Sequence, residues 1–124
     1  MGTASSGAMA EFVAAHPLAL NADRTDFDYD ELGNVKGGVR SPYVDAPVAR
    51  LSGEGQPPAD PFCRLFGTTQ LFDAPALAEL YPDAESYVNA IDTATDSAVA
   101  TGFLRPADAD LIKTRARTSG IGGP

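Results

Sequence analysis

Several residue types that commonly supply catalytic or structural chemistry are scarce in this sequence. It has no Trp, one Cys and one His among 124 residues. The single cysteine, Cys63, excludes an internal disulfide and a thiolate metal cluster, and it fits a buried structural thiol. The single histidine, His16, lies far from Cys63 in the sequence and has no neighbouring group that would orient it, so neither residue is predicted to be catalytic.

Large apolar residues are also few, which limits the hydrophobic core. Leu, Ile, Val and Phe account for 26 of the 124 residues, and much of the 44% hydrophobic fraction is alanine. Alanine buries little area per residue. With 12 Gly and 10 Pro as well, the composition predicts a thin core that gains stability by packing against something else, as in a fragment of a larger protein.

Sequence motifs for several classes of function are missing. The chain contains no Gly-x-Ser-x-Gly nucleophile elbow, no phosphate-binding Gly-Lys-Ser/Thr loop and no zinc-ligand spacing. No carboxylate stands out as one of an acid/base pair. We therefore assign no catalytic, cofactor-binding or metal-binding residue and expect no cofactor, and the residues taken alone favour a non-enzymatic module.

The charge of the chain is strongly acidic, with 9 Lys and Arg against 17 Asp and Glu. A net charge of −8 and a pI near 4.3 argue against nucleic acid and anionic membranes as partners, because both require a basic face. Neither a signal peptide nor a membrane-spanning run is visible, so we expect a soluble chain, and localisation stays unknown.

Residues 33–53 form the most distinctive stretch, rich in glycine and proline. Pro42 and Pro47 fix φ and push the residues before them toward extended backbone, so Tyr43 and Val44 are predicted to form an extended rung. The weak apolar alternation over residues 48–51 predicts a short strand. This pattern favours an ordered ribbon lying along another surface, and the alternative is an ordinary Pro/Gly loop.

Acidic and aromatic residues alternate at positions 26–30, which predicts a strand with Val35 as its hairpin partner. The Asp-x-Asp-x-Asp spacing also resembles a calcium loop. However, the sixth position is Glu31 where that loop requires Gly, and the twelfth is Gly37 where it requires Glu. A solvated strand face is the better interpretation.

The C-terminal half has the periodicity of three helices. They are predicted from Asp73 as N-cap to Leu80, over residues 84–101, and from Pro106 to about residue 117. Leu77, Leu80, Leu111 and Ile112 are expected to face the core, together with one face of the middle helix: Tyr87, Val88, Ile91, Ala94, Ala98 and Val99. Residues 62–66 are the densest apolar patch and are predicted to be buried, with residues 67–69 ending it.

These patterns predict an α+β fold with an extended ribbon and short hairpin in the N-terminal half and three helices in the C-terminal half. The expected organisation is a disordered start and short helix over residues 1–24, an extended ribbon with short strands over 25–72, a three-helix segment over 73–117 and a frayed tail over 118–124.

Three segments together resemble the C-terminal region of the alpha/beta hydrolase domain-containing proteins, an esterase- or lipase-like family. They are residues 30–53 (DELGNVKGGVRSPYVDAPVARLSG), residues 62–73 (FCRLFGTTQLFD), and the LYP, YV, ATD, GFL and PAD motifs between residues 80 and 108. The resemblance covers roughly residues 18–116.

The resemblance implies a fragment of a larger α/β-hydrolase without its catalytic core. The nucleophile and the catalytic His of such enzymes belong to motifs that match no position here, and His16 is not in such a motif. The implied function is a C-terminal accessory segment of a carboxylic-ester hydrolase, inactive alone, with the catalytic core in the same or a separate chain as partner and a homo-oligomer as a further possibility. The alternative is an independent interaction module that binds another protein through the Tyr87/Ile91 face or residues 62–66. A calcium-binding module is a third, weaker hypothesis.

Overall fold

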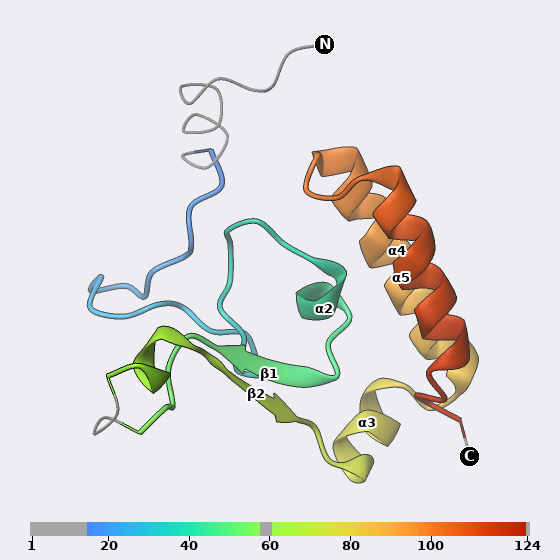
Figure 1. The fold of residues 1–124 in the computed structure, drawn as a ribbon, viewed down its shortest axis with the longest axis horizontal. Helices are drawn as coiled ribbons and strands as arrows, with labels where there is room; N and C mark the ends of the chain where they lie inside the picture. Colours follow the sequence, from blue (N-terminus) through green and yellow to red (C-terminus); the bar gives the residue numbers. More distant parts are fainter. Residues whose placement is uncertain (1–14, 58–60, 124) are drawn as a thin grey trace. The chain divides into compact units, whose positions relative to one another are not determined.

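The computed structural model describes residues 15–57 and 61–123 (Figure 1). The short helix expected over residues 8–15 lies, except for its last residue, outside this described part. The chain divides into two compact units, Met1–Val39 and Arg40–Pro124. Each unit is described by itself.

The first unit is held by three antiparallel bridges, which pair Leu18 with Gly37, Leu20 with Phe27, and Tyr29 with Val35. The last pair confirms the predicted return of the chain at Val35. In the turn between Tyr29 and Val35, the Gly33 amide donates to the Asp30 carbonyl at 3.0 Å. Gly33 has a φ of 87°, which glycine adopts without strain. In place of the continuous strand predicted over residues 26–30, the described residues form single-residue bridges.

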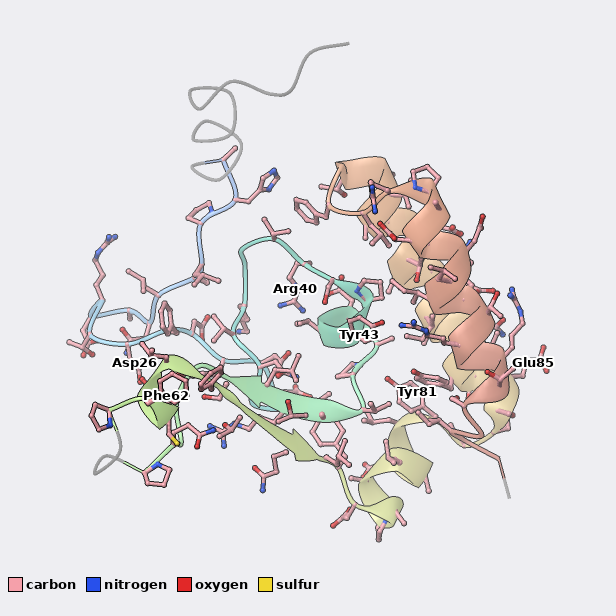
Figure 2. The ribbon with its side chains drawn as sticks, in the orientation of Figure 1. Asp26, Arg40, Tyr43, Phe62, Tyr81 and Glu85 are labelled. Carbon is pink, nitrogen blue, oxygen red and sulfur yellow. The ribbon has the colours of Figure 1, made fainter. Side chains whose placement is uncertain are left out.

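The second unit begins with a one-turn helix, α2 (Pro42–Asp45), which corrects the prediction of an extended rung at Tyr43 and Val44. Ser41 is extended, with φ −106° and ψ 161°, as expected of a residue before proline. Pro42 itself has a φ suited to the first turn of a helix and lacks the N–H that this turn leaves unpaired. The proline therefore starts a helix, and the Arg40 guanidinium pairs with the Asp45 carboxylate at 2.8 Å across it. Figure 2 labels Arg40 just before this helix and Tyr43 within it.

The sheet of this unit is a two-stranded antiparallel pair, β1 (Ala49–Ser52) and β2 (Thr68–Leu71), with Ala49 opposite Leu71 and Ser52 opposite Thr68. The first strand confirms the one predicted over residues 48–51. The second was not predicted, since Thr68 and Thr69 were expected only to end the apolar patch. β-branched threonines suit a strand once β1 is available as a partner. A short 3-10 helix, η1 (Cys63–Leu65), precedes β2.

The three predicted helices are confirmed as α3 (Ala74–Leu80), α4 (Ala84–Thr101) and α5 (Pro106–Thr118). The Asp73 carboxylate caps α3 by accepting from the Ala76 amide at 2.9 Å. Asp83 and Ser86 form a reciprocal capping box at the start of α4. Gly102 ends α4 in the left-handed conformation, with φ 88°.

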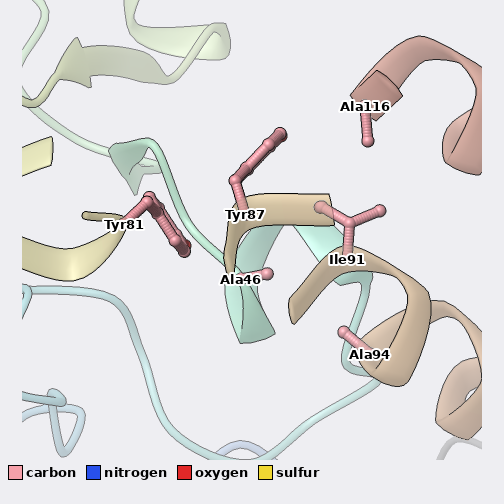
Figure 3. Close-up of a cluster of buried hydrophobic side chains, with 6 residues drawn as sticks. All are labelled: Ala46, Tyr81, Tyr87, Ile91, Ala94 and Ala116. Atoms are coloured by element: carbon pink, nitrogen blue, oxygen red, sulfur yellow. The ribbon is translucent and has the colours of Figure 1, made fainter. Parts of the chain in front are cut away.

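The core of the second unit lies where α4 meets α5 and α2, with Tyr81 packed in from the end of α3 (Figure 3). Its buried side chains are Ala46, Tyr81, Tyr87, Ile91, Ala94 and Ala116. Leu77, Leu80 and Ile112 pack against it, as predicted. Leu111 does not, since it is 57% exposed. Ala109, Ile112 and Ala116 follow the three-and-four spacing that defines the inner face of α5, and position 111 falls outside that face.

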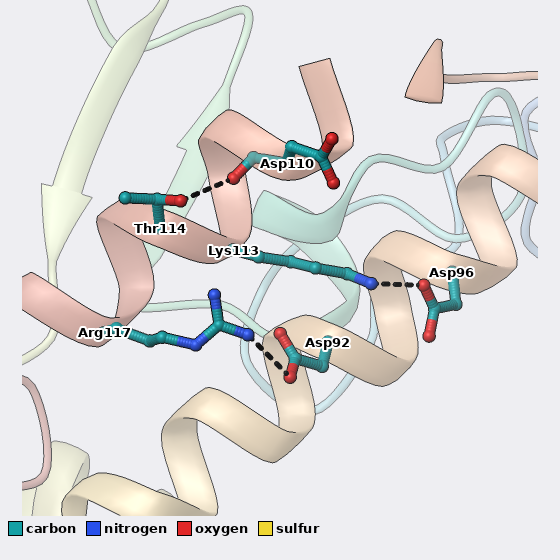
Figure 4. Close-up of polar contacts among 6 residues, drawn as sticks. All are labelled: Asp92, Asp96, Asp110, Lys113, Thr114 and Arg117. Atoms are coloured by element: carbon teal, nitrogen blue, oxygen red, sulfur yellow. Dashed lines mark hydrogen bonds and ion pairs between the residues drawn. The ribbon is translucent and has the colours of Figure 1, made fainter. Parts of the chain in front are cut away.

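Two ion pairs join the polar sides of α4 and α5. The Lys113 ammonium lies 2.6 Å from the Asp96 carboxylate, and the Arg117 guanidinium lies 3.5 Å from that of Asp92 (Figure 4). The hydrogen bond with Asp96, followed by the surrounding carboxylates, raises the pKa of Lys113. Lys113 and Arg117 thus contact the neighbouring helix, and as cations toward the end of α5 they also complement the helix dipole.

Candidate interaction surface

Side chains that commonly catalyse reactions or bind metal ions do not cluster at one place in the described part of the chain. No group of three or more His, Cys, Asp or Glu there could hold a metal ion. Cys63, predicted to be buried, is partly exposed within η1. Phe62, Leu65 and Phe66 around it are exposed as well.

The three acids of the calcium-like spacing serve different local contacts. Asp26 accepts from the Phe27 amide at 2.7 Å, and Asp28 pairs with the Lys36 ammonium at 3.3 Å. Asp30 accepts from the amides of the turn, including that of Asn34 at 2.9 Å. Asp26 and Asp30 therefore contact backbone amides and Asp28 contacts a lysine side chain, so the three carboxylates serve separate contacts.

The buried tyrosines Tyr81 and Tyr87 have raised pKa values, but their contacts are structural. Their rings pack edge to face with centroids 4.9 Å apart, and the Tyr81 hydroxyl donates to the Pro47 carbonyl at 2.8 Å. Burial, with a smaller contribution from Tyr87, raises the pKa of Tyr81 to about 12. Because the hydroxyl is neutral at physiological pH and already donates to a carbonyl, it is not poised as a general base.

The most unusual surface of the second unit is apolar and lies beside the strand pair. It consists of four side chains with large exposed fractions, which we call the hairpin patch: Phe62 (67%), Leu65 (77%), Phe66 (54%) and Leu71 (73%). The rings of Phe62 and Phe66 pack edge to face with centroids 5.3 Å apart. The prediction that residues 62–66 are buried is therefore wrong for this unit. An apolar run indicates that covering its side chains is energetically favourable, but it does not specify that the same chain covers them.

The strand pair beside the patch has a polar side as well as an apolar one. Residues at alternate positions point to opposite faces of a strand, so Arg50 and Gln70 share one face while Leu51 and Leu71 share the other. A shallow cavity of about 400 Å³ on the polar side is lined by Arg50, Ser52, Glu54, Gly55, Thr68 and Gln70. A second cavity of about 500 Å³ is lined by residues that include Leu51, Gly53, Phe66 and Thr69. Neither set contains a histidine or cysteine that could act as base or nucleophile.

In a comparison with protein families, residues 6–114 match the model described as alpha/beta hydrolase domain. The chain belongs to the alpha/beta hydrolase domain family. This match covers nearly the whole sequence, including β1, β2 and most of the helical segment, and it confirms the family indicated by the three sequence segments. Neither the curated proteins nor the solved structures include a significant match.

The fold of the described residues agrees with this family membership. The α+β arrangement of a two-stranded sheet with helices is of a size that fits a fragment of an alpha/beta hydrolase domain. No helix in the described part of the chain is long and apolar enough to cross a membrane. Sequence reasoning identified residues 62–66 as important but missed Leu71, although the β-branched run before it was a usable signal for a strand.

Proposed function

We propose that this chain is a C-terminal accessory segment of an α/β-hydrolase-type carboxylic-ester hydrolase, that it packs on the catalytic core, and that it is inactive alone. The observation that carries the proposal is the family match over residues 6–114 in a sequence without a Gly-x-Ser-x-Gly elbow. Acyl transfer by this class needs a nucleophile, a base and an oxyanion site in one constellation. Other residues, in the same or a separate chain, supply them.

Two features of the described residues support an accessory role. The hairpin patch exposes large apolar side chains, which is the usual mark of a surface that another protein covers. The sheet has only two strands, and a two-stranded pair is marginal without further strands or a covering layer.

Ester hydrolysis tests this proposal directly. The purified chain should not hydrolyse short-chain aryl esters above the buffer rate, and co-expression with a core that contains the elbow should produce activity. Hydrolysis by the purified chain that disappears when one of its own residues is replaced would overturn it. A core that is equally active with and without the chain would also overturn the accessory role.

The second candidate is an independent interaction module with a partner other than a hydrolase. The hairpin patch is the observation that favours it. Its other proposed contact face is less suitable, because Tyr87 and Ile91 are buried in the core of the second unit and are only 6% and 1% exposed. A stable protein complex formed without any hydrolase core would support this candidate.

A further inference from the structure

The polar face of the strand pair carries two cross-strand pairs of side chains. Arg50 lies opposite Gln70, and Ser52 lies opposite Thr68. Residues two apart on a strand share a face, so these four side chains project on the same side of the sheet. Here lies the cavity of about 400 Å³, which we call the strand-face cavity and which is lined by these four residues with Glu54 and Gly55. Its volume is within the range of small-molecule sites.

The loop after β1 is fixed at the edge of this cavity by hydrogen bonds. The Thr68 hydroxyl donates to the Glu54 carbonyl at 2.8 Å, and the Glu54 amide donates to the Ser52 hydroxyl at 3.1 Å. The Gln56 side-chain amide donates to the Gly67 carbonyl at 3.0 Å. Since these bonds use the backbone groups of Glu54, its carboxylate is not needed to hold the loop.

Two groups of opposite charge line the strand-face cavity without pairing with each other. Arg50 and Glu54 are both exposed, and neither forms an ion pair with any residue that the structure describes. The Gln70 side-chain amide forms no hydrogen bond within the same described part of the chain. A guanidinium, an amide and a carboxylate are therefore all available to a ligand in one cavity.

These three groups specify the chemistry of the ligand. A guanidinium binds a carboxylate through two parallel N–H donors, and the amide of Gln70 can donate one more hydrogen bond. A simple anion would also lie against the Glu54 carboxylate, in a chain of net charge −8, and that contact is repulsive. A ligand with an ammonium group beside its carboxylate pairs with both charges at once.

We propose that the strand-face cavity binds a small zwitterion of the amino-acid class. Arg50 and Gln70 hold its carboxylate, and Glu54 holds its ammonium group. The Ser52 and Thr68 hydroxyls, already bonded to the backbone of Glu54, fix the loop that closes the cavity. The site is formed by this chain alone, so the inference goes beyond the proposed function and does not depend on a hydrolase core.

A ligand titration of the unmodified full chain tests the site without any variant. Free glycine should shift the backbone amide NMR signals of residues 50–56 and 68–70 in a saturable way at millimolar concentrations. Acetate, methylammonium and inorganic phosphate each satisfy only one of the two charges, so they should bind at least about tenfold more weakly. The absence of saturable shifts with glycine would overturn the inference. Acetate or phosphate binding as tightly as glycine would indicate a simple anion site and would overturn it too.

Two variants with matched controls then assign the two charges. Arg50→Gln should weaken glycine binding about tenfold or more, whereas Arg115→Gln, which changes an exposed arginine on α5, should not. Glu54→Gln should weaken glycine binding but leave acetate binding unchanged or stronger, because the repelling carboxylate is gone. Glu79→Gln, which changes an exposed acid on α3, is its control.

The variants contradict the inference if the controls weaken glycine binding as much as Arg50→Gln and Glu54→Gln do. A loss of acetate binding in Glu54→Gln that equals its loss of glycine binding would likewise show that Glu54 does not hold an ammonium group. Ester hydrolysis with and without the core is measured separately, so a failure of glycine binding leaves the proposed function standing.

Discussion

The Tyr81 hydroxyl donates a 2.8 Å hydrogen bond to the carbonyl of Pro47, a residue 34 positions earlier in the chain. This bond ties the end of α3 to the segment between α2 and β1, and Tyr81 is only 5% exposed. Its ring also contacts that of Tyr87 in the core. One side chain therefore connects the helical part of the second unit to the segment that leads into β1.

Removing this hydroxyl should destabilise the protein measurably. Tyr81→Phe keeps the ring but leaves the Pro47 carbonyl buried without its donor, which costs about 1–2 kcal/mol of unfolding free energy. Urea denaturation followed by circular dichroism measures the change. Tyr43→Phe is the control, because Tyr43 is 49% exposed, and should change the stability by less than about 0.5 kcal/mol. Equal stability of Tyr81→Phe and wild type would show that this bond does not contribute.

Alkaline pH should unfold the protein through the buried tyrosines. Burial raises the pKa of Tyr81 from 10.0 to about 12, and it also raises that of Tyr87. A raised pKa in the folded state means that the folded protein holds its proton where the unfolded chain has lost it. The contribution is therefore fully present below pH 10 and is lost as the pH rises toward 12. Unfolding free energies from pH 8 to 12 should decline over this window, and absorbance at 295 nm should show Tyr81 and Tyr87 ionising late.

Replacing Gly67 tests whether the close approach of β1 and β2 contributes to the stability of the second unit. A Cβ at this position would collide with the carbonyl oxygen of Ser52, which is backbone and cannot move aside. Gly67→Ala should therefore lower the unfolding free energy by about 1–3 kcal/mol. Gly53→Ala is the matched control, since nothing lies within 4 Å of its added Cβ. Similar thermal unfolding of both variants would contradict the paired arrangement of β1 and β2.

Ile91 and Leu65 should differ sharply in their effect on stability, although both are large aliphatic residues. Ile91 is 1% exposed in the core, and Leu65 is 77% exposed in the hairpin patch. Ile91→Ala should cost about 2–4 kcal/mol, because it leaves a cavity. Leu65→Ala should cost less than about 0.5 kcal/mol in the free chain. Comparable losses for both would mean that the patch is covered in the free protein.

The ion pairs between α4 and α5 should make a small contribution that depends on salt. Lys113→Gln removes the partner of Asp96, whereas Arg115→Gln removes an exposed cation of the same helix without an ion pair to α4. Thermal unfolding at low salt should be lowered more by the first change than by the second, and the difference should shrink in 1 M NaCl. A difference that persists at high salt would indicate a packing effect of the lysine stem.

The helices and their ends could be predicted because their signals are local. Asp73, Asp83 and Gly102 occupy the caps that their residue types favour, and apolar spacing identified most of the buried face of α4. The one-turn helix at Pro42 was missed because a proline is compatible with both an extended turn and a helix start. The strand β2 was missed because four residues carry a weak signal until a partner strand is in place.

The sequence by itself determined the family and the helical periodicity, because family motifs and capping signals are written in the order of neighbouring residues. It also determined that the nucleophile elbow is missing from these 124 residues. Only the tertiary structure decided which apolar side chains are covered: Ile91 is buried, while Phe62, Leu65 and Phe66 remain exposed. Burial depends on which distant segments pack together, and no described segment of the second unit covers Phe62, Leu65 and Phe66. The pairing of β1 with β2 likewise decided which side chains lie opposite one another, with Leu71 opposite Ala49 and Thr69 opposite Leu51.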